Sequence, residues 1–517
     1  MGRAAALRIG AGVLVAAAAA TYGCTSLPPL GARTASVALA DTAGTRLGQA
    51  IAPMAAAHPG RSGIYALSDG RDAFAARVLL ARGAERSLDV QYYIWRDDLT
   101  GTLMLDALRS AAARGVRIRL LLDDNNTAGL DPVLTALDRD PNVEVRLFNP
   151  FGARSWRSLG YLTDFSRLNR RMHNKSFTAD NQVTIVGGRN VGDEYFGVDG
   201  DKLFVDLDVM AVGPVVRDTS QDFDRYWNSA SAYPVTALVD PSAAEAADAL
   251  ALRAAQLRTR PQAQRYLEAI RTSPFVEQLA QQRLPLEWST TQLVSDDPAK
   301  ALGQAAPDER MVADLGKLLG EPKAQVDLVS PYFVPSKRAA QSLVDIARRG
   351  VKVRVLTNSL EATDVAAVHA GYAKWRHELL RAGVSLYELR RRWGPEPPDT
   401  GRGRFGSSAS SLHAKTFGVD SRSVFVGSFN MDRRSIDLNT EMGFVIDSPA
   451  LAQRLGKTLD DSIPETAYEV RLDEEGKLYW IERSNGKTLR YDQEPGTTMW
   501  KRAGVRVLSI LPIDWLL

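Results

Sequence analysis

Residues 171–180 read RMHNKSFTAD and residues 412–420 read LHAKTFGVD, so the pattern His-x-Lys-x-x-x-x-Asp occurs twice, 240 positions apart. The agreement continues beyond the pattern, because Gly187-Gly188-Arg189-Asn190 and Gly427-Ser428-Phe429-Asn430 keep the same spacing. The chain has only five histidines, and two of them stand at equivalent positions. Two copies in register indicate an internal repeat, whereas one copy would read equally well as an amphipathic strand with a solvated lysine.

The two motifs suit chemistry at a phosphate. In an extended segment, residues i and i+2 point to the same face, so we expect His173 to project with Lys175 and His413 with Lys415. The apolar runs 183–186 and 424–426 are predicted partner strands, with turns at Asp180 and Asp420. Lysine and asparagine donors stabilise charge on nonbridging oxygens. One histidine can attack phosphorus while the other protonates the leaving oxygen and then activates the acceptor.

These residues resemble the two HKD motifs of the phospholipase D superfamily, including the trailing Gly-Ser-x-Asn of its second copy. The resemblance implies two similar α/β/α sandwich domains with a shared active site, and a small C-terminal β-meander. It implies that the catalytic residues are His173, Lys175, Asp180, His413, Lys415 and Asp420. It implies that the substrate-binding residues are Asn190, Asn430, Gly188 and Ser428, with Gly188 at a position where a serine is usual. For Asp180 and Asp420 a local turn role competes, since aspartate is favoured in turns.

Three further stretches are similar to bacterial cardiolipin synthases of the C type: DVQYYIW at 89–95, LLDDNN at 121–126 and LPIDWLL at 511–517. This similarity implies a phosphatidyltransferase that forms cardiolipin through a phosphatidyl-histidine intermediate. Phosphatidylglycerol is the implied acceptor, and phosphatidylglycerol or phosphatidylethanolamine the donor. The superfamily favours His173 as nucleophile, which leaves proton transfer to His413. We expect no metal or other cofactor, and activity that persists in chelator, because the cations at the motifs are lysines.

One carboxylate follows each motif and precedes an apolar strand. A carboxylate bonded to one imidazole nitrogen fixes the tautomer and supports the imidazolium. The resemblance gives this orienting role to Glu441 in the second copy. In the first copy our alignment selects Asp208, with Asp206 as the competing choice.

The length and net charge of the chain limit its possible domain organisation and partners. The 517 residues are enough for two domains with substantial cores, and 64 basic against 61 acidic residues do not favour a nucleic-acid partner. Strands alternate with helices in both halves, which predicts an α/β architecture. The expected segments are a signal (1–24), a linker (25–60), a first phospholipase D-like domain (61–240), a helical connector (241–284), a second such domain (285–465) and a β-meander with an apolar tail (466–517).

The N-terminus indicates export. Arg3 and Arg8 precede an apolar run over 9–20, which is short for a bilayer span and has the form of a secretory signal. Cys24, the only cysteine, follows a glycine and resembles a lipoprotein cleavage site. We therefore expect a lipid attached at Cys24 and a place in the bacterial envelope, membrane-associated and facing the periplasm. A retained anchor or a misassigned start is the alternative.

Two segments bear on partners. Residues 151–171 mix arginines with aromatic residues, which suits an anionic bilayer surface or a nucleic acid. The apolar end 508–517, flanked by basic residues, favours membrane contact over docking on the core. Phospholipid substrates and a membrane surface are the expected partners. Hydrolysis by a phospholipase D, a nuclease of the same superfamily and a non-catalytic lipoprotein remain as alternatives.

Overall fold

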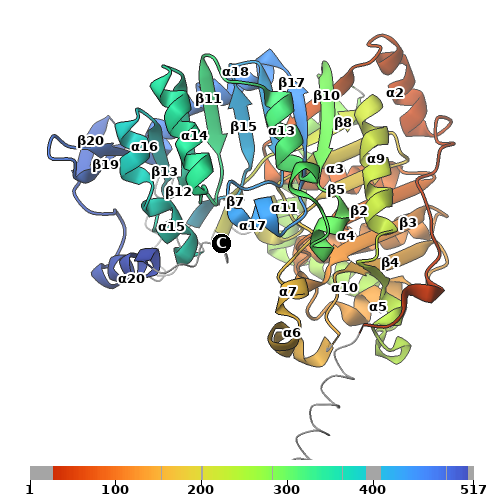
Figure 1. Ribbon diagram of the computed structural model, residues 1–517. Coiled ribbons are helices and arrows are strands. Elements are labelled where there is room, and N and C mark those ends of the chain that lie inside the picture. The colour runs from red at the N-terminus through yellow and green to blue at the C-terminus, as the bar shows by residue number, and fades with distance from the viewer. Residues whose placement is uncertain are drawn as a thin grey trace, which may run out of the picture.

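The computed structural model describes residues 27–152, 154–198, 202–281, 283–363, 365–391, 409–484 and 486–510. The expectations for the signal segment, for Cys24 and for residues 511–517 therefore lie outside the described residues. Within them, the chain is a mixed α/β protein built from two similar halves that stand beside each other (Figure 1). The predicted fold class is confirmed.

In the first half, strands and helices alternate as the sequence predicted: β1 (Ser62–Leu67), α3 (Gly70–Gly83), β2 (Ser87–Tyr92), α4 (Leu99–Ala112), β3 (Arg117–Asp123), α5 (Asp131–Leu137) and β4 (Val143–Phe148). Strands β2, β3 and β4 are parallel. An antiparallel group then completes the sheet: β5 (Ser176–Ala179), β6 (Val183–Gly187) and β8 (Asp208–Val212). Helix α9 (Pro214–Trp227) follows β8.

The second half repeats this plan: β10 (Glu287–Ser295), α13 (Met311–Leu319), β11 (Gln325–Val329), α14 (Lys337–Arg348), β12 (Lys352–Asn358), α15 (Ala366–Ala373), α16 (Arg376–Arg381), β13 (Ser385–Leu389), β15 (Thr416–Val419), β16 (Ser423–Gly427), α17 (Arg433–Asp437) and β17 (Met442–Asp447). Strands β11, β12 and β13 are parallel, and β15, β16 and β17 are antiparallel neighbours. Each motif therefore stands at the start of an equivalent strand, β5 or β15.

The halves join through equivalent strands. β1 pairs antiparallel with β10, with Gly63 opposite Trp288. Each of these strands also pairs with the third antiparallel strand of its own half, β8 or β17. Gly63 permits this close approach, because a Cβ there would lie 3.0 Å from Val212 and 3.1 Å from Trp288. The strands thus form one continuous series across the molecule, and the site-bearing strands of the two halves are brought to one side of the junction.

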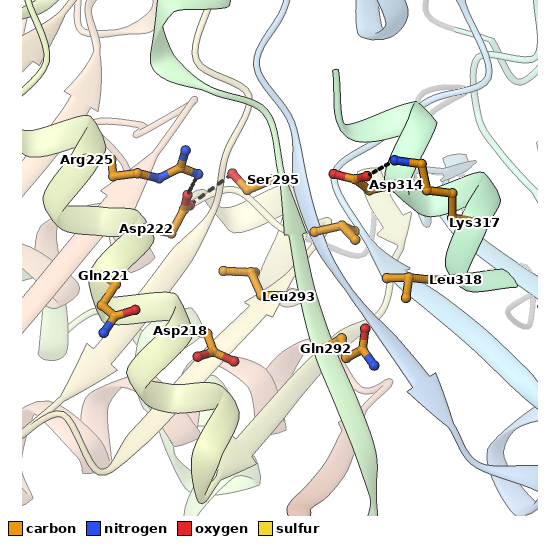
Figure 2. A pocket seen from close by; sticks show the side chains of 11 residues that line it. Asp218, Gln221, Asp222, Arg225, Gln292, Leu293, Ser295, Asp314, Lys317 and Leu318 are labelled. Carbon is orange, nitrogen blue, oxygen red and sulfur yellow. Dashed lines mark hydrogen bonds and ion pairs between the residues drawn. The ribbon is translucent and has the colours of Figure 1, made fainter. Parts of the chain in front are cut away.

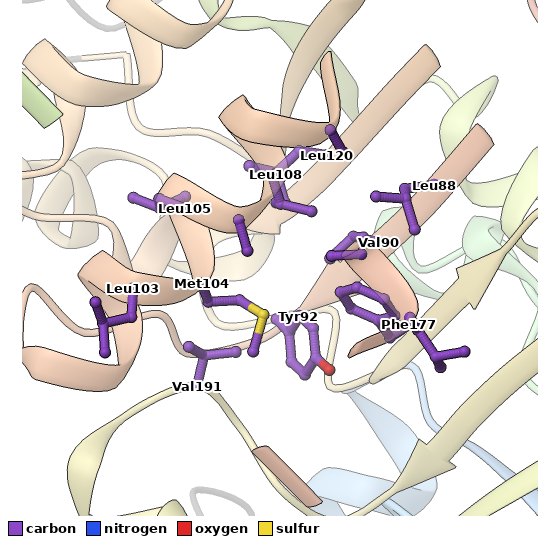
Figure 3. Packing of buried hydrophobic residues seen from close by; sticks show 14 of the residues in the cluster. Leu88, Val90, Tyr92, Leu103, Met104, Leu105, Leu108, Leu120, Phe177 and Val191 are labelled. Atoms are coloured by element: carbon purple, nitrogen blue, oxygen red, sulfur yellow. The ribbon is translucent and has the colours of Figure 1, made fainter. Parts of the chain in front are cut away.

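The core of the first half shows how its parallel strands are covered. All six residues of β2 are buried. Leu88, Val90 and Tyr92 from β2 meet Met104 and Leu108 from α4 in one apolar cluster (Figure 3). The other residues of β2, Ser87, Asp89 and Gln91, are polar but also buried, and Asp89 pairs with Arg119 (2.7 Å), so the strand alternates although both of its faces are covered.

The C-terminal part departs from the expected separate meander. The expected strands exist as β18 (Ala467–Leu472), β19 (Leu478–Ser484) and β20 (Lys487–Tyr491). However, β18 pairs with β13, so these strands extend the second sheet. Helix α20 (Met499–Ile510) then packs on α15, which the sequence did not predict. The connector is helical as expected: α10 (Ala249–Arg258), α11 (Pro261–Arg271) and α12 (Pro274–Ala280).

Candidate active site

The motif histidines and lysines stand just before their strands. β5 begins at Ser176 and β15 at Thr416, so His173, Lys175, His413 and Lys415 lie outside the ladders. The expectation that these side chains project from a regular strand is therefore wrong. Their backbones are instead held by the other half of the molecule: the His173 N–H donates to the Thr440 carbonyl (2.8 Å) and the His413 N–H to the Val205 carbonyl (2.8 Å).

The His173 ring is held by a carboxylate from the second half. Its Nδ1 lies 2.8 Å from Glu441 Oε2, as expected for the orienting residue. Ser428 Oγ donates to the same carboxylate oxygen (2.5 Å), and Ser435 Oγ donates to Glu441 Oε1 (2.8 Å). With Nδ1–H directed at the carboxylate, the lone pair of the neutral ring resides on Nε2.

The His413 ring is held by a carboxylate from the first half, and that residue is Asp206. His413 Nδ1 lies 2.5 Å from Asp206 Oδ2. Lys415 Nζ lies 3.0 Å from the same nitrogen, so the shorter contact indicates that the Nδ1 proton is shared with Asp206. The assignment of this role to Asp208 is wrong. Asp208 pairs instead with the buried Arg77 (2.8 Å) and with Arg189 (3.3 Å).

Strand register explains this correction. Gly187 pairs with Asp208, whereas the equivalent Gly427 pairs with Gly443. Asp208 is therefore equivalent to Gly443, and Asp206 is equivalent to Glu441. Each carboxylate crosses to the histidine of the opposite half, which a sequence alignment of the two halves does not reveal.

The position of the Asp206 carboxylate, on a shorter side chain than that of Glu441, explains why the first copy has a glycine at position 188. A Cβ on Gly188 would lie 2.2 Å from Asp206 Oδ1, so a serine does not fit there. In the second half the longer Glu441 leaves room for Ser428, whose hydroxyl bonds to it. Gly188 with Asp206 and Ser428 with Glu441 are thus matched pairs, and the missing hydroxyl is replaced on Asp206 Oδ1 by the Leu207 N–H (2.8 Å).

Both lysines are buried beside their histidines. Each ammonium donates to the backbone carbonyl of the histidine two residues earlier, over 2.5 Å in the Lys175–His173 pair. Burial lowers the pKa of Lys175 well below its ordinary value, and Lys415 lowers it further, although Glu441 opposes both. Two neighbouring ammonium groups with little water around them favour the binding of an anion.

The histidines are neutral in this site. Burial, together with both lysines, lowers the pKa of His173 to about 4 and that of His413 to about 3, against the effects of Glu441 and Asp206 respectively. Burial opposes the effect of His173 on Glu441, yet the pKa of that carboxyl stays below its ordinary value. Because each imidazole responds to the lysines of both copies, the two motifs form one electrostatic site.

Asparagines and tyrosines complete the site. Asn190 Oδ1 accepts from the Ile94 N–H (3.2 Å), and its amide nitrogen is buried without a hydrogen-bond partner among the described residues. Asn430 is also buried, and its backbone N–H bonds to Ser435 Oγ. The Tyr93 ring packs edge-on against His173 (4.9 Å between centroids) and the Tyr195 ring against His413 (5.1 Å). No pattern in the sequence had predicted a site role for either tyrosine.

Asp180 and Asp420 lie at the far end of the hairpins. Both have positive φ (51° and 53°), as have the residues that follow them, which is the geometry of a tight hairpin turn. Asp180 accepts from the N–H groups of residues 85–87, and Asp420 from those of residues 323–325. About five strand residues, or roughly 15 Å, separate each aspartate from its lysine. The expected catalytic assignment is therefore corrected to a structural one.

The described residues contain no group of three or more His, Cys, Asp or Glu side chains arranged to hold a metal ion. A separate groove of about 480 Å³ lies between α9, β10 and α13 (Figure 2). It is lined by Asp222, which pairs with Arg225 and accepts from Ser295 Oγ (3.0 Å). No motif residue lines it, so it is distinct from the candidate active site.

Comparisons with known proteins agree with this geometry. A family model described as "Cardiolipin synthase, PLD-like domain" matches residues 80–227 and again 315–462. Cardiolipin synthase C of Escherichia coli is 52% identical over 91% of this chain and 100% of its own length. Cardiolipin synthase A of Pseudomonas syringae is 26% identical over 62% of this chain and 55% of its own length. The crystal structure of phosphatidylserine synthase from Haemophilus influenzae shares the fold, with a TM-score of 0.52 and 14% identity over 78% of this chain and 87% of that one.

Proposed function

The chain belongs to the cardiolipin synthase family with two PLD-like domains, and we propose that it is a phosphatidyltransferase that forms cardiolipin from two phospholipids. The observation that carries this proposal is the crossed pair of histidine–carboxylate contacts, His173 with Glu441 and His413 with Asp206. They give two neutral imidazoles of fixed tautomer beside two lysines. Without a metal ion, transfer at a phosphodiester requires a nucleophile, a general acid and cations that stabilise the phosphate oxygens, and these residues supply all three.

In the first step, His173 Nε2 attacks the phosphorus of the donor lipid. A P–N bond forms, the P–O bond to the headgroup breaks, and His413 gives its proton to the leaving alkoxide. In the second step, a glycerol hydroxyl of phosphatidylglycerol loses its proton to His413 and attacks phosphorus, which breaks the P–N bond and releases His173. Lys175 and Lys415 stabilise the oxygens in both steps.

The low pKa values of the histidines fit this sequence. His173 must be neutral to attack, and burial beside two lysines keeps it neutral. His413 must carry a proton to act as an acid, although burial and the lysines hold its pKa at about 3. A bound phosphodiester brings a negative charge between the lysines and thereby raises the pKa of His413. Protonation of the acid is thus coupled to substrate binding.

The arginines of residues 151–171 favour a lipid over a nucleic acid. Arg154 pairs with Asp124 (3.0 Å) and Asp131, and Arg157 with Asp131 (3.3 Å). Arg167 pairs with Asp164 (2.6 Å). Because these guanidinium groups are neutralised within the protein, the segment offers little net positive charge to a polyanion.

The direct test is lipid mass spectrometry on cells that lack cardiolipin and express this chain. We expect cardiolipin to appear, and to be absent with His173→Ala. Isotopic label in phosphatidylethanolamine or phosphatidylglycerol then identifies the donor. Phosphatidic acid without cardiolipin would instead establish hydrolysis.

We place the protein at the membrane of the bacterial envelope, where its lipid substrates lie. The described helices are all too short or too polar to cross a bilayer. A lipid on Cys24 with the chain facing the periplasm is the anchorage that the N-terminal sequence supports. The mass of the mature chain tests this, since Cys24→Ala removes the lipid.

A further inference from the structure

Helix α6 (Arg157–Thr163) and its flanks have apolar side chains on the side that faces solvent. Trp156, Leu159, Leu162 and Phe165 are spaced three residues apart and are 68%, 50%, 82% and 41% exposed. The opposite side is polar and faces the protein: Arg157 donates to the Asp124 carbonyl (2.7 Å) and Tyr161 Oη to Asn125 Oδ1 (2.7 Å). This amphipathicity is the reverse of that of an ordinary surface helix, which buries its apolar side.

Helix α20 exposes a second apolar surface. Met499, Trp500 and Val507 are 64%, 79% and 62% exposed, whereas Val505 packs with Leu508 against α15. Arg506 is exposed among them. The sequence continues as LPIDWLL over 511–517, which adds apolar residues and a tryptophan to this end of the chain.

Both surfaces lie on the side of the molecule that carries the active site. α6 follows the carboxyl end of β4, and α20 packs on α15, which follows the carboxyl end of β12. Figure 1 shows α6 and α20 at the same lower edge of the molecule. On the first half, Tyr161 bonds to Asn125, and the adjacent Asn126 contacts Tyr93, whose ring packs on His173. On the second half, Asn358 at the end of β12 accepts from the Leu412 N–H (2.9 Å), next to His413, and Leu360 packs with Val505 of α20.

We propose that the α6 row (Trp156, Leu159, Leu162 and Phe165) and the α20 surface (Met499, Trp500 and Val507) together form a docking surface for an anionic phospholipid bilayer. This proposal rests on the proposed function, because the bilayer is chosen as the occupant that holds the substrates. Tryptophan at each surface suits headgroup depth, and Arg506 suits anionic headgroups. Docking this face turns the strand ends beside the two motifs toward the bilayer, so both lipids can reach the shared site with their acyl chains still in the membrane.

A single-cysteine experiment on the full chain tests the contact. Cys24 is the only cysteine, so a Cys24→Ser background accepts one label at a time. We place an environment-sensitive fluorophore at Leu162→Cys or Val507→Cys. The matched control is Leu489→Cys, an exposed leucine (50%) on β20 at the outer edge of the second sheet. With vesicles of phosphatidylglycerol and phosphatidylethanolamine, we expect a blue shift and quenching by spin-labelled lipid at 162 and 507, and neither at 489.

Two outcomes would overturn the proposal. One is a label at 162 or 507 that stays as accessible to an aqueous quencher as the label at 489. The other is protection of these labels by a single-stranded oligonucleotide or by a second copy of the chain, but not by vesicles. Because the Cys24→Ser background removes the proposed lipid anchor and the readout is local, protection of these labels reports contact by the two surfaces themselves.

A kinetic arm separates docking from chemistry. We expect Leu159→Glu with Leu162→Glu to lower turnover on vesicles by about tenfold or more, since charge replaces buried apolar surface. Turnover of a water-soluble short-chain phosphodiester should change less than about twofold, and Leu489→Glu should change neither rate. Equal loss on both substrates with unchanged thermal unfolding would contradict docking. A wild-type chain that docks but makes no cardiolipin would contradict the proposed function alone.

Discussion

The two histidines are chemically alike, and their surroundings divide their roles. His173 is bonded to Glu441, which two serine hydroxyls also contact, whereas His413 is bonded to the shorter Asp206. A nitrophenyl phosphodiester needs no general acid, because its leaving group is already good. His413→Ala should therefore still form a covalent adduct slowly, and His173→Ala should form none. Peptide mass spectrometry locates the adduct, and an adduct on the peptide that contains His413 would reverse the assignment.

The pH dependence of the first step should report the buried state of His173. Its pKa is about 4 because burial and two lysines disfavour the protonated ring. The ring therefore remains a nucleophile well below pH 6.5, the ordinary value for histidine. With the nitrophenyl substrate below saturation, the second-order rate constant of adduct formation, which reports the free enzyme, should stay nearly constant from pH 7 to pH 5 and decline only toward pH 4. A midpoint near 6.5 would show that the site is solvated.

Substitution of the two aspartates near β8 should have different effects, one mainly on catalysis and the other mainly on stability. Asp206→Asn should lower kcat by about a hundredfold or more, because the imidazole loses the partner that fixes its tautomer. Asp208→Asn leaves Arg77 and Arg189 without their buried carboxylate, which should cost about 3–5 kcal/mol of unfolding free energy. Steady-state rates and urea unfolding measure the contrast. A catalytic loss with unchanged stability in Asp208→Asn would restore the original assignment.

The sequence allowed the residues of the site to be predicted better than their contacts. His173, Lys175, His413 and Lys415 were found because the two motifs keep the same spacing along the sequence, and Glu441 because the family resemblance implies its role. Asp206 was displaced by Asp208 because both precede the same apolar strand, and only the register of β6 with β8 distinguishes them.

At the level of elements, the hairpin turns carry the motif aspartates. Asp180 is buried and accepts from three backbone N–H groups, and Asp420 does the same with partners at the surface. Asp180→Ala should lower stability by about 1–3 kcal/mol or more, and Asp420→Ala by less, since water can replace its bonds. Activity per folded molecule should fall less than about tenfold in both. Unchanged thermal unfolding with lost activity would return them to the catalytic set.

The parallel strands were predictable as elements because apolar residues recur at every second position, as Val143, Val145 and Leu147 do in β4. The strands of the motifs were extended too far, since His173 and Lys175 are held by the other half of the chain and not by a ladder. Helix α20 was missed because its apolar residues were interpreted as a tail; its exposed Trp500 and Val507 do not form the buried stripe that indicates a helix.

At the scale of the whole molecule, the repeat predicted two like halves, and the pairing of β1 with β10 shows how they join. This pairing was not predictable, because the periodicity of apolar residues in a strand does not indicate which other strand it pairs with. It brings each histidine to the carboxylate of the opposite half, so neither half holds a complete site. The account therefore depends on one active site that both halves build.

The initial rate of cardiolipin formation by the single variants His173→Ala and His413→Ala tests this claim most directly. One shared site requires both imidazoles in every turnover, so each variant should lose about a thousandfold or more of the wild-type rate with phospholipid substrates. Normal unfolding curves for both variants serve as the control. Two independent sites would instead leave each variant with about half of the wild-type rate, and that result would contradict the account.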